Sequence, residues 1–563
     1  MIGISESTAQ QRAWTMLGME NGVHEVLRSI DGSFGATNLP FTISIWLFDP
    51  QSKQLHAPEN LKSNECVASL KKGYLPISIF SYPAGNFTIE THLFVNSHGD
   101  VDEDAVAYCR VIVQNNLPTQ ATAKLVVVFR PKLINDVAGA VNSVLFDKTS
   151  MSVTVNDSLT MLFDEAPELF FGSSGDIALT LNEMIQSNKK NDSLNIETFS
   201  SSLNDASCAF VFPVSCSESR RRWQTTLQIP MSFKKSKEEM TRLRRLNAES
   251  EEADVARYWE RRLRKDAVNI SLPDEKAEHA YYASLAYLLI GMDKGTIQSG
   301  PFAGENDETF EYSQSYQALL QSNLKEIVRQ NLTNQFFTSE KFIAQAATYY
   351  RFARDKHFLK SAWKSILSVA EQHQSDSLFI NELQEVVFLA RELGERDDVK
   401  RFKNAVKELE KRTATTDRTN RIDTTSIRTV ISAIQSSSAA ANTLCALRSC
   451  LLYEEKERLV LGEGIPREWL RAGERIQVEN MPTHWGTLSY TMLVSKDGKK
   501  VSLKLSGDIE PPDGFVVRLP FREKEIERAT INRRETSVEE SGEILLEQGI
   551  RSVSVTLKKP LSK

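Results

Sequence analysis

Two kinds of hydrophobic pattern divide the chain. Between Arg12 and about Pro230, short runs alternate apolar and polar residues. A period of two, together with many β-branched and aromatic residues, is typical of strands that are buried on one face. The clearest runs cover residues 41–48, 87–95, 106–113 and 124–129. Turn residues such as Asn115-Asn116 and Pro131 separate the runs. The pattern predicts a large antiparallel β-sandwich over residues 1–232.

The pattern becomes helical at about Lys234. Apolar residues then recur every three or four positions, as at Val255, Trp259 and Leu263. Basic side chains in this segment alternate with acidic ones, which favours a solvated helix with internal ion pairs over a nucleic-acid-binding face. We predict a helical linker over residues 233–272.

Residues 273–453 continue with helical stripes. The stripes predict six or seven packed helices, and Gly394 is expected to end one of them. A polar stretch between Lys411 and Ala441 predicts a loop or an insertion. Beyond Glu454 the alternation of period two returns, with Lys496-Asp-Gly-Lys499 as a hairpin turn, and predicts a small β-domain over residues 454–563.

Composition excludes several classes of protein. The 563 residues carry a net charge of −6, from 68 basic and 74 acidic side chains, so no strong positive field attracts nucleic acid. No apolar window of about 18 residues predicts a membrane span, and the first residues lack the pattern of a signal peptide. We therefore expect a cytoplasmic protein without a nucleic-acid or membrane partner. The six cysteines predict buried thiols rather than disulfides.

Motifs for common enzyme chemistry are missing from the sequence. It contains no Gly-x-Ser-x-Gly elbow, no phosphate-binding loop and no His-Glu-x-x-His helix. The eight histidines form no cluster with metal-ligand spacing. We expect neither a cofactor nor a metal.

Three stretches together resemble the six-hairpin glycosidases. Tyr258-Trp-Glu-Arg-Arg-Leu263, followed by a helix over 281–289, is similar to their linker and first barrel helix. Residues 342–359, which end in Asp-x-x-Phe-Leu, resemble one of their helical hairpins. Residues 461–470 and 478–490 are similar to the start of their terminal β-domain. The resemblance implies a multidomain α+β fold: an N-terminal antiparallel β-sandwich, a helical linker, an (α/α) barrel and a C-terminal small β-domain.

The chain departs from this family in two ways. An aromatic residue followed by Arg-Asp usually contacts the sugar on the second barrel helix, but Phe310-Glu-Tyr-Ser-Gln-Ser-Tyr316 stands at that place. A ring of twelve helices also requires about 200 residues, and the helical segment is shorter than that. We therefore expect an incomplete barrel that has lost hairpins between Glu371 and Leu378 and around residues 411–438.

Glycoside hydrolysis generally needs two carboxyl groups on either side of the scissile bond. The densest candidates are Glu305, Asp307 and Glu308, with Glu311, in a loop that the resemblance places beside the pocket. An acidic loop that starts a helix is the alternative interpretation. Glu382 lies three residues before Glu385 on one helix and is the candidate partner, although both also fit a solvated surface.

Aromatic side chains are candidates for binding a saccharide. Tyr312 and Tyr316 occupy the segment that replaces the usual sugar-contacting pair. His484 and Trp485 lie in a tight turn where the related enzymes carry an aromatic residue, and packing against the barrel is the alternative role.

Three functional hypotheses follow. The first is a catalytically degenerate relative of glycoside hydrolases that serves as a saccharide-binding or assembly subunit. The second is an active hydrolase of an α-glucan or a related oligosaccharide that uses paired carboxylates. The third is a structural homo-oligomer, in which a second copy covers surfaces that the missing hairpins expose.

Overall fold

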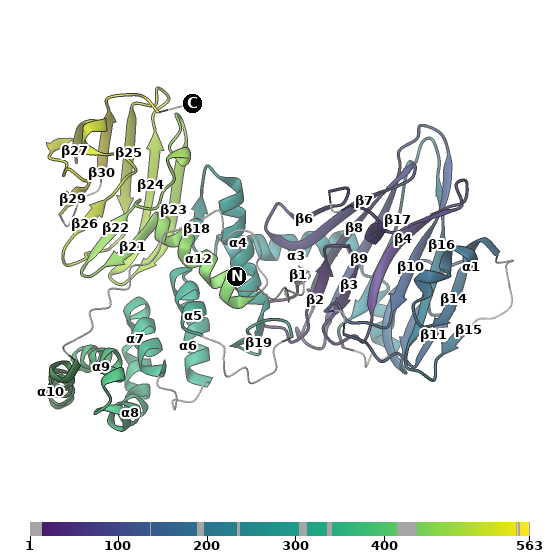
Figure 1. The fold of residues 1–563 in the computed structure, drawn as a ribbon, viewed down its shortest axis with the longest axis horizontal. Helices are drawn as coiled ribbons and strands as arrows, with labels where there is room; N and C mark the ends of the chain where they lie inside the picture. The colour runs from purple at the N-terminus through teal and green to yellow at the C-terminus, as the bar shows by residue number, and fades with distance from the viewer. Residues whose placement is uncertain are drawn as a thin grey trace, which may run out of the picture. The chain divides into compact units, whose positions relative to one another are not determined.

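The protein, described here by a computed structural model, divides into two compact units. The structure describes residues 14–62, 64–135, 137–187, 196–232, 237–302, 312–334, 341–413, 436–547, 549 and 552–561. Unit 1 contains Met1–Glu260, Leu289–Lys294 and Gly300–Asn306, and unit 2 contains Arg261–Leu288, Gly295–Ser299 and Asp307–Lys563. Antiparallel sheets come first, helices follow, and β-structure ends the chain, so the predicted multidomain α+β class is confirmed (Figure 1). The four predicted domain ranges stay predictions.

The first sheet of unit 1 has eight described strands. They run in the order β1-β2-β3-β4-β10-β16-β14, and β5 pairs with β4. Their bounds are β1 Trp14–Leu17, β2 Val26–Ser29, β3 Phe34–Ala36, β4 Thr42–Asp49, β5 Gln54–His56, β10 Ala121–Arg130, β14 Leu169–Ser174 and β16 Ala206–Cys216.

The second sheet of unit 1 has nine described strands. They run in the order β15-β11-β12-β13-β17-β9-β8-β7-β6. Their bounds are β6 Val67–Lys71, β7 Leu75–Ala84, β8 Phe87–Ser97, β9 Ala105–Asn115, β11 Ser143–Asp147, β12 Ser152–Val155, β13 Ser158–Phe163, β15 Ile196–Ser200 and β17 Arg222–Pro230. The four strongest predicted runs correspond to β4, β8, β9 and β10, and those predictions are confirmed.

One apolar core lies between the two sheets. Val127 on β10 pairs with Ile45 on β4 and with Phe210 on β16, and all three side chains are buried. Leu93 and Val111 on the second sheet belong to the same core. Alternate residues of each strand thus meet across the sandwich, as the period of two requires. A smaller cluster on the outer side of the first sheet includes residues of helix α1 (Leu181–Ser187). All six cysteines are free thiols, and four of them are buried.

The linker helices lie against the second sheet within unit 1. They are α2 (Lys237–Leu243) and the first part of α3 (Ala248–Arg264). Glu252 on α3 is only 3% exposed, and its carboxylate accepts hydrogen bonds from Lys71 at 2.7 Å and Arg110 at 2.5 Å. His92 Nδ1 lies 2.9 Å from the same carboxylate. Asn96 and His98 contact the neighbouring Glu251 at 2.8 and 2.7 Å, so side chains of the sheet hold two buried carboxylates in succession.

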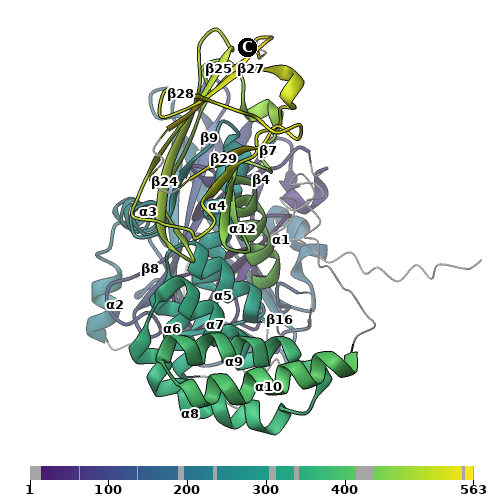
Figure 2. The same cartoon turned by 90° about the vertical axis from the view of Figure 1, so that its left-hand side faces the viewer.

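The helices of unit 2 form a row in which α12 contacts α5, α5 contacts α7, α7 contacts α9 and α9 contacts α10. Helix α6 packs on α5 and α7, and α8 packs on α7 and α9. Figure 2 shows α10 alongside α9. No described helix is long and apolar enough to cross a lipid bilayer. The bounds are α4 Glu275–Ile290, α5 Tyr312–Gln321, α6 Lys325–Asn334, α7 Lys341–Ala353, α8 Lys356–His373, α9 Ile380–Leu393, α10 Arg396–Thr413 and α12 Ser437–Leu451.

Eight helices are thus described between residues 273 and 453, so the predicted number of six or seven was too low. The apolar stripes did not indicate α5 and α6, because their Gln, Ser and Asn residues interrupt the pattern. Gly394 ends α9 with a φ of 86°, as predicted, since a left-handed C-cap favours glycine. The predicted loop between 411 and 441 falls mostly outside the described residues.

Unit 2 ends in two sheets. The larger runs in the order β18-β23-β24-β25-β30-β27-β28, and the smaller one is β21-β22-β26-β29. The hairpin predicted at 496–499 joins β24 to β25, where Gly498 has a φ of 69°. The bounds are β18 Asn269–Ser271, β21 Leu452–Glu455, β22 Arg458–Leu461, β23 Arg475–Thr483, β24 Gly486–Val494, β25 Lys500–Ser506, β26 Phe515–Val517, β27 Ile526–Ile531, β28 Arg534–Thr536, β29 Ile544–Leu546 and β30 Ser552–Leu557. Two short strands, β19 Met292–Asp293 and β20 Thr296–Ile297, lie outside both sheets.

We expect the Glu252 cluster to make the stability of unit 1 depend on acid pH. Burial by itself raises the pKa of Glu252, but the hydrogen bonds from His92, Lys71 and Arg110 outweigh it and lower the pKa from 4.5 to about 2. Because the folded protein binds this proton more weakly than the unfolded chain, the stabilisation is complete above pH 4.5. It should be lost as the pH falls from about 4.5 to about 2, and it amounts to about 3 kcal/mol.

Calorimetric unfolding of the full chain and of Glu252→Gln checks this expectation. The variant should unfold at a lower temperature at pH 7 and lose the difference from the wild type near pH 2. Glu249→Gln is the matched control, because Glu249 contacts the same Arg110 but is 60% exposed. A Glu252→Gln protein with wild-type stability at pH 7 would contradict the assigned role.

Candidate functional site

The structure describes only some of the predicted carboxylates. Glu305, Asp307, Glu308 and Glu311 fall outside the described residues. Glu382 lies in the first turn of α9 and is partly buried, and its Oε2 atom has no hydrogen-bond partner among the described residues. The paired arrangement that hydrolysis requires is therefore not seen among the described candidates.

Side chains of α7, together with Arg354 just beyond its end, hold the carboxylates further along α9. Arg351 Nη2 donates to Glu385 Oε2 at 2.6 Å. Two helical turns further along α9, Tyr350 donates its hydroxyl to Glu392 at 3.0 Å, and Arg354 lies 3.7 Å from the same carboxylate. These contacts form a row of polar and charged pairs between the end of α7 and α9. Glu385 is a structural ion-pair partner in this geometry.

The aromatic candidates Tyr312 and Tyr316 stack on each other in α5. Their ring centroids lie 5.9 Å apart with an angle of 26° between the planes. Tyr316 is only 1% exposed, so its ring belongs to the core between the helices, whereas Tyr312 is partly exposed. A role of either residue in binding a saccharide stays a prediction.

The turn that holds His484 and Trp485 packs on the end of α7. The His484 ring contacts Phe352 edge to face at a centroid distance of 4.8 Å, and Arg354 donates to the His484 carbonyl at 2.6 Å. Burial lowers the pKa of His484 from 6.5 to about 4, the nearby arginines lower it too, and Glu454 opposes them. The imidazole is thus neutral at pH 7. This packing matches the alternative role that the sequence left open for the turn.

A buried ion pair fixes the same turn to α12. Arg448 on α12 is 2% exposed and donates to both carboxylate oxygens of Glu454 at 2.6 Å. Its Nη2 also donates to the Pro482 carbonyl at 3.1 Å. Burial by itself raises the pKa of Glu454, but Arg448 outweighs it and the net pKa is lowered. Arg448, Arg351 and Arg354 were not singled out from the sequence, because an ion pair between separate elements depends on which elements become neighbours.

Six described carboxyls of unit 2 have a shifted pKa, and their surroundings favour the ionised form. Where the pKa of a described Asp or Glu of this unit departs from its ordinary value, it is lowered. Asp355, at the amino end of α8, is an example: burial opposes ionisation, but Phe358, Tyr349 and Arg329 donate hydrogen bonds that lower its pKa. Among the described residues, no group of three or more His, Cys, Asp or Glu has the geometry of a metal site.

Comparison with known proteins finds glycoside hydrolases. No family profile matches the sequence, and no curated protein matches it. A GH92 inverting mannosidase of Bacteroides thetaiotaomicron matches 97% of this chain and 93% of its own, with 9% identity and a TM-score of 0.43. A GH78 rhamnosidase of Bacillus sp. GL1 matches 76% of this chain, with 9% identity and a TM-score of 0.33.

A third similar structure is an α-L-rhamnosidase of Streptomyces avermitilis complexed with L-rhamnose, with 8% identity and a TM-score of 0.31 over 82% of this chain. The chain spans 54% of the Bacillus enzyme and 62% of the Streptomyces enzyme. With every TM-score below 0.5, these similarities identify neither a site nor an activity in this chain.

Removing Arg448 should destabilise unit 2 strongly. Arg448→Met leaves the Glu454 carboxylate, which is 11% exposed, without its cation, and breaking a buried pair in this way costs about 3 to 5 kcal/mol. Arg448→Met combined with Glu454→Leu should recover much of the loss, because no charge is then left buried without its partner. Urea denaturation of both variants measures these differences. Arg471→Met is the control, because Arg471 is an exposed arginine of the same unit. If Arg448→Met were as stable as this control, the role of Arg448 would be refuted.

Proposed function

We propose that this chain is a glycoside-hydrolase-related protein that binds saccharides without hydrolysing them and acts as a saccharide-binding or assembly subunit. Two features support its relation to the six-hairpin glycosidases. The chain places a β-sandwich, a helical linker, helical hairpins and a small β-domain in the order of that family. The three sequence stretches that resemble the family fall in the linker and first helix, in α7 and the start of α8, and in the strands around His484.

The observation that carries the absence of hydrolysis is the ion pair between Arg351 and Glu385. A general acid must hold its proton near neutral pH, which requires a raised pKa. The Glu385 carboxylate is instead engaged by Arg351 Nη2 at 2.6 Å, as a structural link between α7 and α9. Glu385 is the described candidate nearest in sequence to Glu382, and its pairing leaves Glu382 without an acid partner among the described residues.

The competing function is an active hydrolase of an α-glucan or a related oligosaccharide. It would use Glu305, Asp307 or Glu308 as the acid and Glu382 as the base. The buried Oε2 atom of Glu382, which has no hydrogen-bond partner among the described residues, is the one structural feature that favours this alternative.

We expect no hydrolysis when the purified chain is incubated with maltooligosaccharides and with rhamnose- and mannose-containing oligosaccharides. Release of reducing sugar should stay at least about a thousandfold below the turnover of about 10 s⁻¹ that is typical of enzymes. The same oligosaccharides should raise the unfolding temperature, because a ligand that binds the folded state stabilises it. Glu305→Gln and Glu382→Gln should leave both results unchanged.

Hydrolysis that either of these variants abolishes would replace the proposed function with the competing one. No thermal shift with any oligosaccharide would refute saccharide binding. Light scattering on the same samples tests the assembly role, which a monomeric mass with and without oligosaccharide would contradict.

A further inference from the structure

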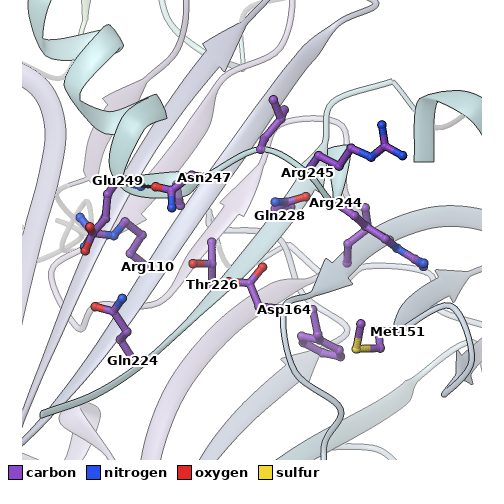
Figure 3. Close-up of a pocket in the computed structure, with 14 residues that line it drawn as sticks. Arg110, Met151, Asp164, Gln224, Thr226, Gln228, Arg244, Arg245, Asn247 and Glu249 are labelled. Atoms are coloured by element: carbon purple, nitrogen blue, oxygen red, sulfur yellow. Dashed lines mark hydrogen bonds and ion pairs between the residues drawn. The ribbon is translucent and has the colours of Figure 1, made fainter. Parts of the chain in front are cut away.

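Unit 1 contains a pocket of about 430 Å³ between the outer face of the second sheet and the linker. Strand β17 forms its floor, the end of β13 one side, and the segment that joins α2 to α3 its rim (Figure 3). The volume lies near the lower end of the range of small-molecule sites, about 300 to 1,000 Å³. It suits one or two sugar rings.

The floor is a row of polar side chains on one face of β17. Figure 3 shows Gln224, Thr226 and Gln228 in succession along the strand. Alternate residues of a strand lie about 6.7 Å apart on the same face, so the row presents amide and hydroxyl groups at regular intervals. Thr226 is paired in register with Arg110 of β9, which Glu249 and Glu252 already bind. The row is thus fixed on a rigid sheet.

Gln228 is the residue that points most clearly to a ligand. It is 2% exposed, and its Oε1 atom has no hydrogen-bond partner among the described residues. A buried polar group without a partner costs about 1 to 3 kcal/mol, and nearly all such groups in folded proteins are paired. Gln228 lines the hollow, so a hydroxyl group held in the pocket is a suitable donor.

Two arginines supply positive charge at the rim. Arg244 and Arg245 are exposed, and neither forms an ion pair among the described residues. Their neighbour Arg242, in contrast, is bound to Asp104 at 3.0 Å. Asp164 lies beside Thr226 in Figure 3 and is the acidic side chain among these groups that no arginine binds. The two guanidinium groups therefore leave the rim with a net positive charge and ten N–H donors.

We propose that this pocket binds a small polyhydroxylated anion, of the class of a sugar acid or a sugar phosphate. Arg244 and Arg245 bind the carboxylate or phosphate, because a guanidinium matches either group with two parallel hydrogen bonds. Gln224, Thr226, Gln228 and Asp164 bind the hydroxyl groups, and the ring of Phe163 provides an apolar wall. The inference rests on the proposed function, since it places the saccharide in unit 1 rather than among the helices.

Isothermal titration of the full chain with glucuronic acid, glucose 6-phosphate, glucose and inorganic phosphate tests the site. Arg244→Gln combined with Arg245→Gln should weaken binding of both sugar anions at least about tenfold and leave glucose unchanged. Gln228→Leu should weaken glucose and the sugar anions alike. This substitution removes the unpaired amide and keeps the volume, so the unfolding temperature should not fall.

Arg533→Gln combined with Arg534→Gln is the matched control, because these are two adjacent exposed arginines in unit 2 that no described ion pair involves. The control should bind the sugar anions as the wild type does.

Three results overturn the inference. Sugar anions that bind equally well to wild type, Arg244→Gln/Arg245→Gln and Gln228→Leu would place the site elsewhere, while the proposed function would stand. Inorganic phosphate that binds as tightly as the sugar anions would show an anion site without sugar recognition. A wild type that binds none of the four probes also overturns the inference. The proposed function survives that result if the neutral oligosaccharides still raise the unfolding temperature. If they do not, both the inference and the proposed function fail.

Discussion

Glu252 lies almost wholly buried against the outer face of the second sheet, where a carboxylate is stable only if it is paired and hydrogen-bonded. Lys71, His92 and Arg110 come from three different strands of that sheet and converge on this one group. The start of α3 is therefore tied to a fixed place on the sheet. Because α3 continues directly from the segment that carries Arg244 and Arg245, the same cluster determines where the rim of the pocket lies above β17. The contacts of Glu252 thus fix the linker segment that borders the pocket relative to β17.

The second unit uses carboxylates in the same structural way. Arg448 holds Glu454 in the interior, and Arg351 holds Glu385 between two helices. An ion pair of this kind and a catalytic acid place opposite demands on a carboxyl group, since the first stabilises the charge and the second must remain neutral at pH 7. In this unit the described ion pairs Arg448–Glu454 and Arg351–Glu385 join separate helices and strands to one another.

The sequence predicted much of this fold because burial on one face leaves a visible period. The runs at 41–48 and 106–113 became β4 and β9, and Gly394 ended its helix as expected. Helices α5 and α6 were missed because their buried positions include Ser315, Gln321 and Asn331, which break the apolar stripe. The arginines that bind Glu385 and Glu454 were missed for another reason: an ion pair between separate elements depends on which helices become neighbours, and no local pattern encodes that.

The pocket shows the same limit most clearly. In the sequence, Gln224, Thr226 and Gln228 alternate with the buried residues Thr225, Leu227 and Ile229, which is the pattern of a strand with one solvated face. The fold covers that face with the linker, so Thr226 and Gln228 become buried without becoming apolar. A polar side chain in such a place must find a partner or destabilise the protein. Thr226 has one in Asp164, but the Oε1 atom of Gln228 has none among the described residues and borders a hollow. If this face of β17 served only to pack against the linker, apolar residues would be expected at Thr226 and Gln228. The polar row is therefore better explained by a ligand than by the fold.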